Sequence, residues 1–411
     1  MPTNAERKKS EAALNSFHTY YGAALNWGQE RWQSSLYPAL CQPTRYAAVV
    51  NQFVSEDHAN SALRMQNFGG SELVSVQSVL QEFRLPALQS SATTERTRGM
   101  LVLEQILPNA VRDESVPKSS LFPPPSPAPS VVDPTKQLLT HWNLDAASAL
   151  CAHMLDVQPG HRVLDLCAAP GGKSVALAQQ LFPHLQGHSA DSARNDMSES
   201  GCLHSNEMDN QRNRRLLNNL RSYLPGALFS AGNVKIFQLD STDPKTLTTL
   251  PHGHGQYDRV LLDAPCSSER HIVQAHVRAA SAGHIAEEMA RWRPGSSKNI
   301  AKIQVLLLMT ALKAVKLGGR VVYSTCSISS EENDGVIEKM FLLLEKERKK
   351  GICAWNVRIE LGKKGAGDMV ADMTRLDGLS EATEYGRIVV PDHGDGGWGP
   401  LFFCVLTKVT A

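Results

Sequence analysis

The chain has 411 residues, of which 42% are hydrophobic and 20% are charged, and this composition excludes a wholly disordered protein. Lysine and arginine total 42 against 41 for aspartate and glutamate, so no overall positive charge indicates nucleic acid, and such contact must depend on local patches or a partner. The most apolar stretch, residues 305–312, is far too short to span a bilayer, so we expect no membrane contact.

The eight cysteines are too few for a disulfide scaffold, and no two are spaced as C-x-x-C. We therefore expect reduced thiols and no metal site. The first eleven residues contain Arg7, Lys8 and Lys9 but also the acids Glu6 and Glu11. A mitochondrial presequence is Arg-rich and poor in acids, so these residues do not match one.

Three regions are predicted along the chain. In residues 1–95, apolar side chains such as Tyr37, Leu40, Val49 and Val50 recur at helical spacing, which predicts a mainly helical region. Residues 96–135 are proline-rich and peak in FPPPSPAP at 122–129, which favours an extended linker or strap. The sequence pattern changes again in residues 136–411.

In this last region short apolar runs alternate with helical patterns. The predicted strands are residues 163–166, 202–205, 234–239, 259–262, 320–323 and 401–409, and the predicted helices are residues 146–155, 212–224 and 299–316. Such alternation indicates a Rossmann-like α/β fold, with a mostly parallel sheet and an antiparallel last strand. Residues 187–200, rich in Ser, Asp and Asn, read as a surface insertion. The string SSEE at 329–332 resembles a capping box that opens another helix.

A glycine-rich turn, VLDLCAAPGGKS at 163–174, follows the first of these strands and leads into a helix. Backbone N–H groups of such a turn can approach a phosphate or a nucleoside cofactor closely. A Walker A loop would need glycine where Cys167 stands, so the P-loop interpretation fails at a required position. A cofactor turn and a merely tight loop both remain open.

Polar side chains end several successive strands. Glu207, Asp240 and Asp263 are the acids, and Cys266 and Cys326 follow two of the strands in the strings DAPC and STC. Ligands of open α/β sheets bind at the carboxyl edge of the strands, so we expect these side chains to face a ligand. A thiol there is a potential nucleophile, because thiolates are strongly nucleophilic. The alternative is two buried structural cysteines.

Three ordered motifs resemble those of the Sun-type RNA cytosine-5 methyltransferases: DLCAAPGGK at 165–173, DAPC at 263–266, and YSTCS at 323–327 with EEN at 331–333. LDAAS at 144–148, Gln304 and GPLFF at 399–403 support this resemblance, which covers most of residues 136–411. Within the family, NWGQERW at 26–32 and YAAVVN at 46–51 are similar to the mitochondrial small-subunit rRNA member.

The resemblance implies an S-adenosylmethionine site and assigns residues to it. These are Cys167, Ala168, Ala169, Pro170, Gly171, Gly172, Lys173, Glu207, Arg212, Asp240 and Asp263. Glu207 would bind the ribose hydroxyls, although the family more often has aspartate there.

The resemblance also implies a two-thiol mechanism for cytosine methylation. Cys326 would add to carbon 6 of the base and so make carbon 5 nucleophilic. Asp263 would assist at the N3 edge of the ring, and Cys266 would assist release of the thiol after methyl transfer. The helix expected to open at Ser329 is a candidate for activating the Cys326 thiol.

The sequence and the resemblance also bear on RNA contact, a protein partner and the cellular compartment. Two basic clusters, Arg212, Arg214, Arg215 and Arg221, and Arg291, Arg293, Lys298 and Lys302 around Trp292, suit RNA binding or are merely solvated. The closer resemblance implies a helical-repeat partner of the mitochondrial termination-factor type. It also implies a mitochondrial location, with the cytoplasm or nucleus as the alternative.

Two rival functions stay open. The chain could be a non-catalytic rRNA-binding assembly factor that retains the fold, or a methyltransferase acting on protein or a small molecule. The intact pair Cys266 and Cys326 argues against a decayed site, and a methyltransferase of the second kind would not need Cys326.

Overall fold

A computed structural model describes residues 3–23, 26–64, 80–82, 85–86, 88, 100, 102–105, 124–186, 201–366, 369–394 and 397–411. These residues form two compact units. The central unit comprises Arg45–Asp263 and Ala311–Val322, and the terminal unit comprises Met1–Thr44, Ala264–Thr310 and Tyr323–Ala411. The predicted surface insertion at 187–200 and much of the predicted linker lie outside the described residues.

The central unit contains most of the predicted α/β pattern. Its elements are β1 (Ala47–Val50), α4 (Glu56–Arg64), β2 (Leu80–Glu82), β3 (Val102–Gln105), β4 (Pro127–Pro129), β5 (Gln137–Leu139), β6 (His141–Leu144), α5 (Ala146–Met154), β7 (Arg162–Asp165), α6 (Gly172–Leu181), η5 (Pro183–Leu185), β8 (Cys202–Asn206), α7 (Asn210–Tyr223), α8 (Gly226–Ser230), β9 (Val234–Phe237), α9 (Thr246–Thr249), β10 (Tyr257–Asp263) and much of β11 (Val315–Thr325).

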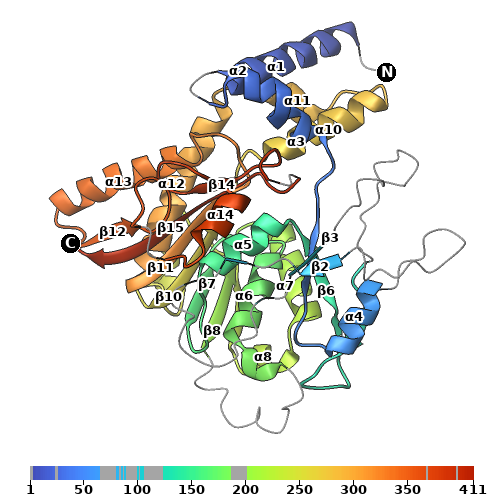
Figure 1. Cartoon of the computed structure of the whole chain (residues 1–411). Helices are drawn as coiled ribbons and strands as arrows, with labels where there is room; N and C mark the ends of the chain where they lie inside the picture. The colour runs from blue at the N-terminus through green and yellow to red at the C-terminus, as the bar shows by residue number, and fades with distance from the viewer. Residues whose placement is uncertain are drawn as a thin grey trace, which may run out of the picture. The chain divides into compact units, whose positions relative to one another are not determined.

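Its main sheet has the strand order β11-β10-β7-β8-β9, and β10, β7, β8 and β9 run parallel. Helix α6 lies against β8 and α7 against β9, as parallel strands require helical crossovers (Figure 1). From β7 the chain continues outward to β8 and β9, and later returns to the other side of β7 with β10. The strand order therefore reverses between β7 and β10, and ligands of such sheets bind at the carboxyl ends beside this point.

One predicted helical stretch is a strand instead. Residues around Val49 and Val50 form β1, which pairs antiparallel with β3 on one side and with β6 on the other. All four residues of β1 are buried, so this Ala-Ala-Val-Val run is apolar on both faces. Periodicity cannot separate such a short apolar run from a helix segment, and β-branched valines favour the strand. Two strands lie within the predicted linker: β3, which pairs with β1 and β2, and β4, which pairs with β5 just beyond it.

The terminal unit combines helices with antiparallel strands. Its elements are α1 (Asn4–Gly22), α2 (Gln29–Arg31), the π-helix η1 (Trp32–Leu36), α3 (Tyr37–Cys41), α10 (Glu269–Ser281), α11 (Glu287–Arg291), most of α12 (Ser296–Ala314), the end of β11, α13 (Asp334–Lys349), β12 (Trp355–Ile359), α14 (Met373–Leu379), β13 (Glu381–Ala382), β14 (Arg387–Val389) and β15 (Leu401–Thr410). The last strand, β15, runs antiparallel to β12 and to β14. Among the described residues, no helix has the length and apolar character needed to cross a membrane.

The predicted capping box at 329–332 is wrong. Helix α13 begins at Asp334, and the residue before it, Asn333, makes no side-chain cap. Glu332 is fully buried, and its carboxylate accepts hydrogen bonds from Ser267 and Gln304 rather than from the backbone at Ser329. A local four-residue signal was therefore overridden by tertiary hydrogen bonds.

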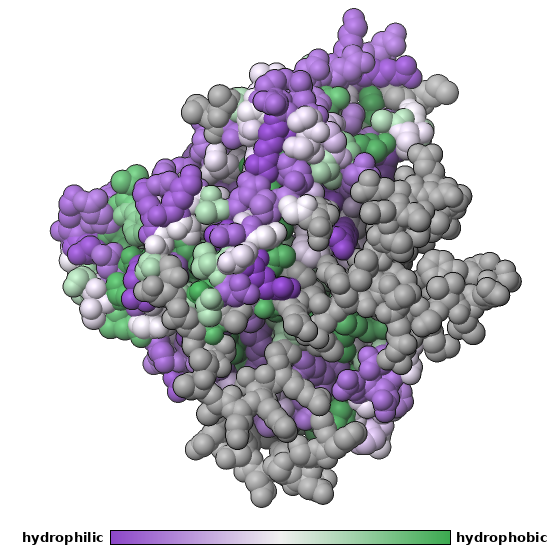
Figure 2. Space-filling model, in the orientation of Figure 1, coloured by the Kyte–Doolittle hydropathy of each residue, from purple (hydrophilic) through white to green (hydrophobic). Residues whose placement is uncertain are grey.

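Trp292 does not serve as a stacking surface for RNA bases. It is buried, and its ring lies 5.0 Å from Phe17, 5.7 Å from Tyr20 and 6.0 Å from Tyr21, centroid to centroid. These rings belong to α1, whose other side is exposed and hydrophilic (Figure 2). The indole is thus the core contact that attaches α1 to the segment after α11.

Candidate active site

The glycine-rich turn is shaped by close packing at the start of α6. Gly171 has φ +116°, a left-handed conformation that favours glycine, and it caps α6. A Cβ on Gly172 would lie 2.5 Å from Nε1 of Trp142, so a side chain there has no room. The N-terminus of α6 is consequently bare backbone at the carboxyl end of β7.

We expect Gly172→Ala to lower the free energy of unfolding by about 1–3 kcal/mol, the usual cost of overpacking a tight site. Gly226→Ala is the matched control, because no heavy atom lies within 4 Å of the added Cβ and Gly226 also begins a helix. Urea unfolding of both variants measures the difference. Equal stabilities would show that the Trp142 contact does not constrain the turn.

Side chains from neighbouring elements hold the carbonyl groups of this turn. The Arg212 guanidinium donates a hydrogen bond to the Ala169 carbonyl at 3.0 Å, and the Asn219 amide donates to the Pro170 carbonyl at 2.7 Å. The Ala168 N–H donates to the carbonyl of Asn206 at 2.8 Å. Helix α7 and the end of β8 thereby keep the turn in place.

Glu207 follows β8 and is buried, unlike most acids. One carboxylate oxygen accepts from the Asp209 N–H at 3.0 Å, and the other lies 3.4 Å from the Arg212 guanidinium. The Glu207 carboxylate is thus fixed in position, where its oxygens can accept hydrogen bonds from hydroxyl groups.

Lys173 and Asp263 form an ion pair at 2.7 Å that joins the start of α6 to the end of β10. The Lys173 ammonium also donates to the Ser148 hydroxyl at 3.1 Å. Lys173 is therefore engaged by a carboxylate, which agrees with rejection of the P-loop interpretation.

Asp165, the last residue of β7, is a second acid beside this pair. Burial and the charge of Asp263 raise the pKa of the Asp165 carboxyl to about 7, although Ser174 donates a hydrogen bond to it at 2.7 Å. In the unfolded chain an aspartate has a pKa of about 3.9. At a pH between these two pKa values, the Asp165 carboxyl keeps its proton in the folded protein, whereas the unfolded chain has released it.

This difference predicts a pH dependence of stability. The contribution of Asp165 is fully present below about pH 4 and is lost as the pH rises toward about 7. We expect the free energy of unfolding of the wild type, relative to Asp165→Asn, to fall over this window, because the asparagine cannot ionise. Urea unfolding of both proteins at several pH values measures it, and parallel curves would contradict it.

Asp240 is exposed, and its carboxylate accepts hydrogen bonds from the Thr242 N–H at 2.9 Å and the Thr242 hydroxyl at 2.7 Å. These bonds lower the pKa of the Asp240 carboxyl. It follows β9 as the sequence predicted, but its carboxylate hydrogen-bonds within its own loop.

The two predicted thiols lie together in the terminal unit. The Sγ atoms of Cys266 and Cys326 are 2.9 Å apart, and the Ser268 hydroxyl lies 3.0 Å from Cys326 Sγ. The hydrogen bond to Cys326, together with burial, holds the pKa of the Cys266 thiol well above its usual range. Cys266 thus keeps its proton and can donate it toward Cys326. None of the eight cysteines, all of which are described, forms a disulfide.

Two buried carboxylates position the loops that carry these thiols. Glu269 accepts from the Tyr21 hydroxyl at 2.7 Å and from the Ile328 N–H at 3.0 Å, and Glu332 accepts from the Ser267 N–H at 3.0 Å. The Ser267 hydroxyl bonds to both carboxylates. Burial and the charge of Glu269 raise the pKa of the Glu332 carboxyl. The loops after β10 and β11 are therefore joined through shared side chains.

Sequence reasoning missed two residues of this arrangement. Asn206 is buried and its amide donates to the carbonyls of Leu166 and Leu239, so it ties the ends of three strands. Ser268 has φ +53°, an unusual conformation for a residue other than glycine, and it supplies the hydroxyl beside Cys326. The signal was present in each case, since Asn206 precedes Glu207 and Ser268 follows Cys266 by two residues.

The parallel sheet, its reversal beside β7 and the glycine turn at that edge define a Rossmann-like nucleoside-cofactor fold of the methyltransferase type. Two solved structures from Pyrococcus horikoshii share this fold. "NSun6 with SFG" has a TM-score of 0.51 at 18% identity and covers 96% of this chain and 98% of its own. A "methyltransferase homolog protein" has a TM-score of 0.51 at 20% identity and covers 99% of this chain and 100% of its own.

Residues 152–379 match the family model described as 16S rRNA methyltransferase RsmB/F. The chain belongs to this family.

Relatives in animals are named for two RNA substrates. A mitochondrial tRNA (cytosine(34)-C(5))-methyltransferase of Danio rerio is 32% identical over 70% of this chain and 66% of its own length. The 5-cytosine rRNA methyltransferase NSUN4 of Xenopus laevis is 28% identical over 97% of this chain and 91% of its own, and that of Mus musculus 27% over 99% and 91%. For the Danio protein and for NSUN4 of Xenopus tropicalis, the match spans less than two thirds of the relative.

Proposed function

We propose that this chain is an S-adenosylmethionine-dependent RNA cytosine-5 methyltransferase and that residues 136–411 form its catalytic domain. The observation that carries the proposal is the 2.9 Å contact between Cys266 and Cys326, with the Ser268 hydroxyl beside it. Methyl transfer to oxygen, nitrogen or a protein side chain needs no thiol adduct. Two adjacent thiols suit a reaction in which one adds to the base and the other assists its departure.

The turn of residues 167–173 suits the cofactor. Gly171 and Gly172 leave backbone exposed at the start of α6, and Glu207 is a buried acid of the type that binds ribose hydroxyls. Arg212 supports both the Ala169 carbonyl and Glu207, so we assign it a positioning role. Asp240 and Asp263 complete the proposed set. S-adenosylmethionine supplies an electrophilic methyl group on sulfur.

The reaction needs a nucleophile because carbon 5 of cytosine is unreactive. The Cys326 thiolate adds to carbon 6 of the base, and the displaced electron pair makes carbon 5 nucleophilic. Carbon 5 then takes the methyl group. A base removes the proton from carbon 5, the bond between Cys326 Sγ and carbon 6 breaks, and the thiolate leaves.

The residues around Cys326 fit this sequence of steps. The Ser268 hydroxyl and the Cys266 thiol lie 3.0 and 2.9 Å from Cys326 Sγ, where both can donate hydrogen bonds that stabilise a thiolate at Cys326. This replaces activation by a helix starting at Ser329, because α13 starts at Asp334. Asp263 is proposed to hydrogen-bond the N3 edge of the ring, with its charge balanced by Lys173.

We propose small-subunit rRNA of mitochondria as the substrate and the mitochondrion as the location. The rRNA-named relatives from Xenopus laevis and Mus musculus align over 97% and 99% of this chain, and over 91% of their own lengths. The tRNA-named relative from Danio rerio aligns over 70%. The rRNA-named relatives from Xenopus tropicalis and Bos taurus align over 66% of this chain. The alignments over nearly the whole chain, with the rRNA-named relatives of Xenopus laevis and Mus musculus, support the rRNA substrate over the tRNA.

A protein partner of the helical-repeat type is also proposed. The net charge is only +1, so the chain lacks the general positive charge that holds RNA. The arginines of α7, Arg212, Arg214, Arg215 and Arg221, are exposed, with Arg212 and Arg215 on one side of the helix and Arg214 and Arg221 on the opposite side. A partner with a basic surface would add phosphate contacts to those of α7.

The test is transfer of labelled methyl groups from S-adenosylmethionine to mitochondrial small-subunit rRNA, followed by mapping of the modified base. Mitochondrial tRNA and cytosolic rRNA serve as competing substrates, with and without a helical-repeat partner. We expect 5-methylcytosine in the small-subunit rRNA. Preference for tRNA would overturn the proposal that small-subunit rRNA is the substrate. Cofactor and RNA binding without transfer under every condition would instead favour an assembly factor.

A further inference from the structure

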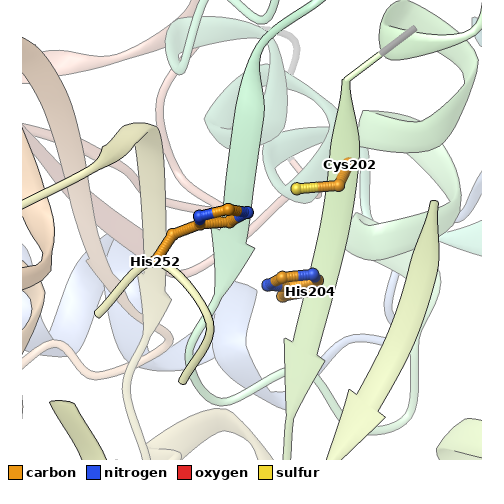
Figure 3. Close-up of side chains that lie close together, drawn as sticks. All are labelled: Cys202, His204 and His252. Carbon is orange, nitrogen blue, oxygen red and sulfur yellow. The ribbon is translucent and has the colours of Figure 1, made fainter. Parts of the chain in front are cut away.

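Three metal-ligand side chains of the central unit gather away from the residues discussed so far. Cys202, His204 and His252 have their ligand atoms within 4.8 Å of one another. In Figure 3 the Cys202 sulfur points toward the two imidazole rings. Cys202 and His204 are two residues apart on β8 and so project from the same face of the strand. His252 comes from the loop before β10.

The cluster lies at the opposite end of β8 from Glu207. Cys202 pairs with Arg162, the first residue of β7, whereas Glu207 follows the last residue of β8. In the strand order β7 separates β8 from β10, so the His252 loop reaches past β7 to approach β8. A metal ion bound by these ligands would join β8 to the loop before β10, and β8 and β10 do not pair with each other.

His204 is already oriented as a metal-binding histidine. Its Nδ1 lies 2.7 Å from the Tyr257 hydroxyl, which leaves Nε2 as the atom available for a ligand. Histidine ligands commonly use the second ring nitrogen in such a bond, which fixes the orientation of the ring. The imidazole is only 2% exposed and contacts the ring of Phe237, so this is a built interior position rather than a surface histidine.

Backbone packing brings the other two ligands close. A Cβ on Gly201, beside Cys202, would collide with the His161 carbonyl, and one on Gly253, beside His252, would collide with the Leu247 carbonyl. The backbone next to each ligand is thus held tightly. The His252 Nδ1 lies 3.4 Å from Gln256 Oε1, and its ring is 5.6 Å from that of Tyr257, centroid to centroid. Its ring lies parallel to that of His204 and must rotate to aim a lone pair at a shared point.

We propose that Cys202, His204 and His252 bind one zinc-class divalent cation, with a water molecule as the fourth ligand. Cysteine sulfur and imidazole nitrogen are the ligands that zinc prefers, at about 2.3 and 2.0–2.1 Å. Binding converts the Cys202 thiol to a thiolate and releases its proton to solvent. The ion ties the loop before β10 to β8, so its role is structural. The sequence predicted no metal site, because these ligands lack a zinc-motif spacing.

The test uses the full chain after removal of metal by a chelator. Zinc is added, the bound equivalents are counted by native mass spectrometry, and thermal unfolding is followed. We expect one equivalent and a rise in Tm of roughly 5 °C at a hundredfold excess over Kd. Cobalt(II) in place of zinc should show the thiolate-to-metal absorption band of a cysteine ligand.

Variants locate the ion. Cys202→Ser and His252→Gln should each lose the equivalent, the Tm rise and the cobalt band. Cys353→Ser, a part-buried cysteine elsewhere, should keep all three. Cys266→Ser should also keep them, which excludes zinc held by the thiol pair. His252→Gln lies on a half-exposed loop, so it tests the site even if Cys202→Ser fails to fold.

Two results would overturn the proposal. One is that the wild type takes up no zinc at micromolar concentrations. The other is that zinc binding and the cobalt band survive in His252→Gln but vanish in Cys266→Ser. Neither outcome touches the methyltransferase proposal, because the cluster is at the opposite end of β8 from Glu207.

Discussion

Cys326→Ala abolishes methyl transfer, and Cys266→Ala leaves RNA covalently joined to the protein. These are the results expected if Cys326 adds to the base and Cys266 assists the break of that bond. Loss of a covalent nucleophile lowers turnover by about 10³-fold or more. Transfer from labelled S-adenosylmethionine measures the first effect, and denaturing electrophoresis with labelled RNA measures the second.

Cys353→Ala is the control for both variants, since this part-buried cysteine is separate from the pair. It should methylate RNA at the wild-type rate and form no adduct. The double variant Cys266→Ala/Cys326→Ala should form no adduct, because the nucleophile is absent. Methyl transfer that persists in Cys326→Ala would exclude the thiol mechanism and favour a protein or small-molecule substrate.

Asp263→Asn is expected to lower kcat by about 10²–10⁴-fold, the range for loss of a proton-transferring group. Asparagine keeps the shape of the side chain but cannot take up a proton. Because asparagine keeps a side-chain oxygen that can accept a hydrogen bond from the cofactor, we expect the Kd for S-adenosylmethionine to change by less than about 5-fold, equivalent to about 1 kcal/mol. Single-turnover kinetics and calorimetry measure the two quantities.

The matched control is Asp258→Asn at the opposite end of the same strand. Asp258 also pairs with a lysine, Lys316, so the change in charge and pairing is similar. Its kcat should remain within a few-fold of wild type. If Asp263→Asn instead loses cofactor affinity and retains kcat at saturation, Asp263 belongs to the cofactor site alone.

Much of the fold was predictable where each pattern was long or repeated. The alternating runs correctly predicted β7, β8, β9, β10, α5 and α7, because a buried parallel strand must be apolar and its crossover helix must be amphipathic. Two predicted boundaries differ from the structure. The helix expected to run to residue 316 ends at Ala314, and β11 begins before Gly318.

Predictions from short local signals failed for a shared reason. Val49 and Val50 fit a helical pattern, but they belong to a strand that pairs with β3 on one side and β6 on the other. Ser329 and Glu332 fit a capping box, but the buried Glu332 carboxylate accepts hydrogen bonds from Ser267 and Gln304 instead. Trp292 stands among cations in the sequence, but aromatic residues of α1 bury it.

The sequence alone determined which chemistry this chain can carry. A glycine turn after a strand, acids at strand ends and two cysteines in DAPC and STC are residue types, and residue types are written in the chain. Tertiary structure decided which of them meet. Neither the approach of Cys266 to Cys326 nor the gathering of Cys202, His204 and His252 could be read from spacing. Contacts between residues tens of positions apart depend on strand order and packing, which no local pattern encodes.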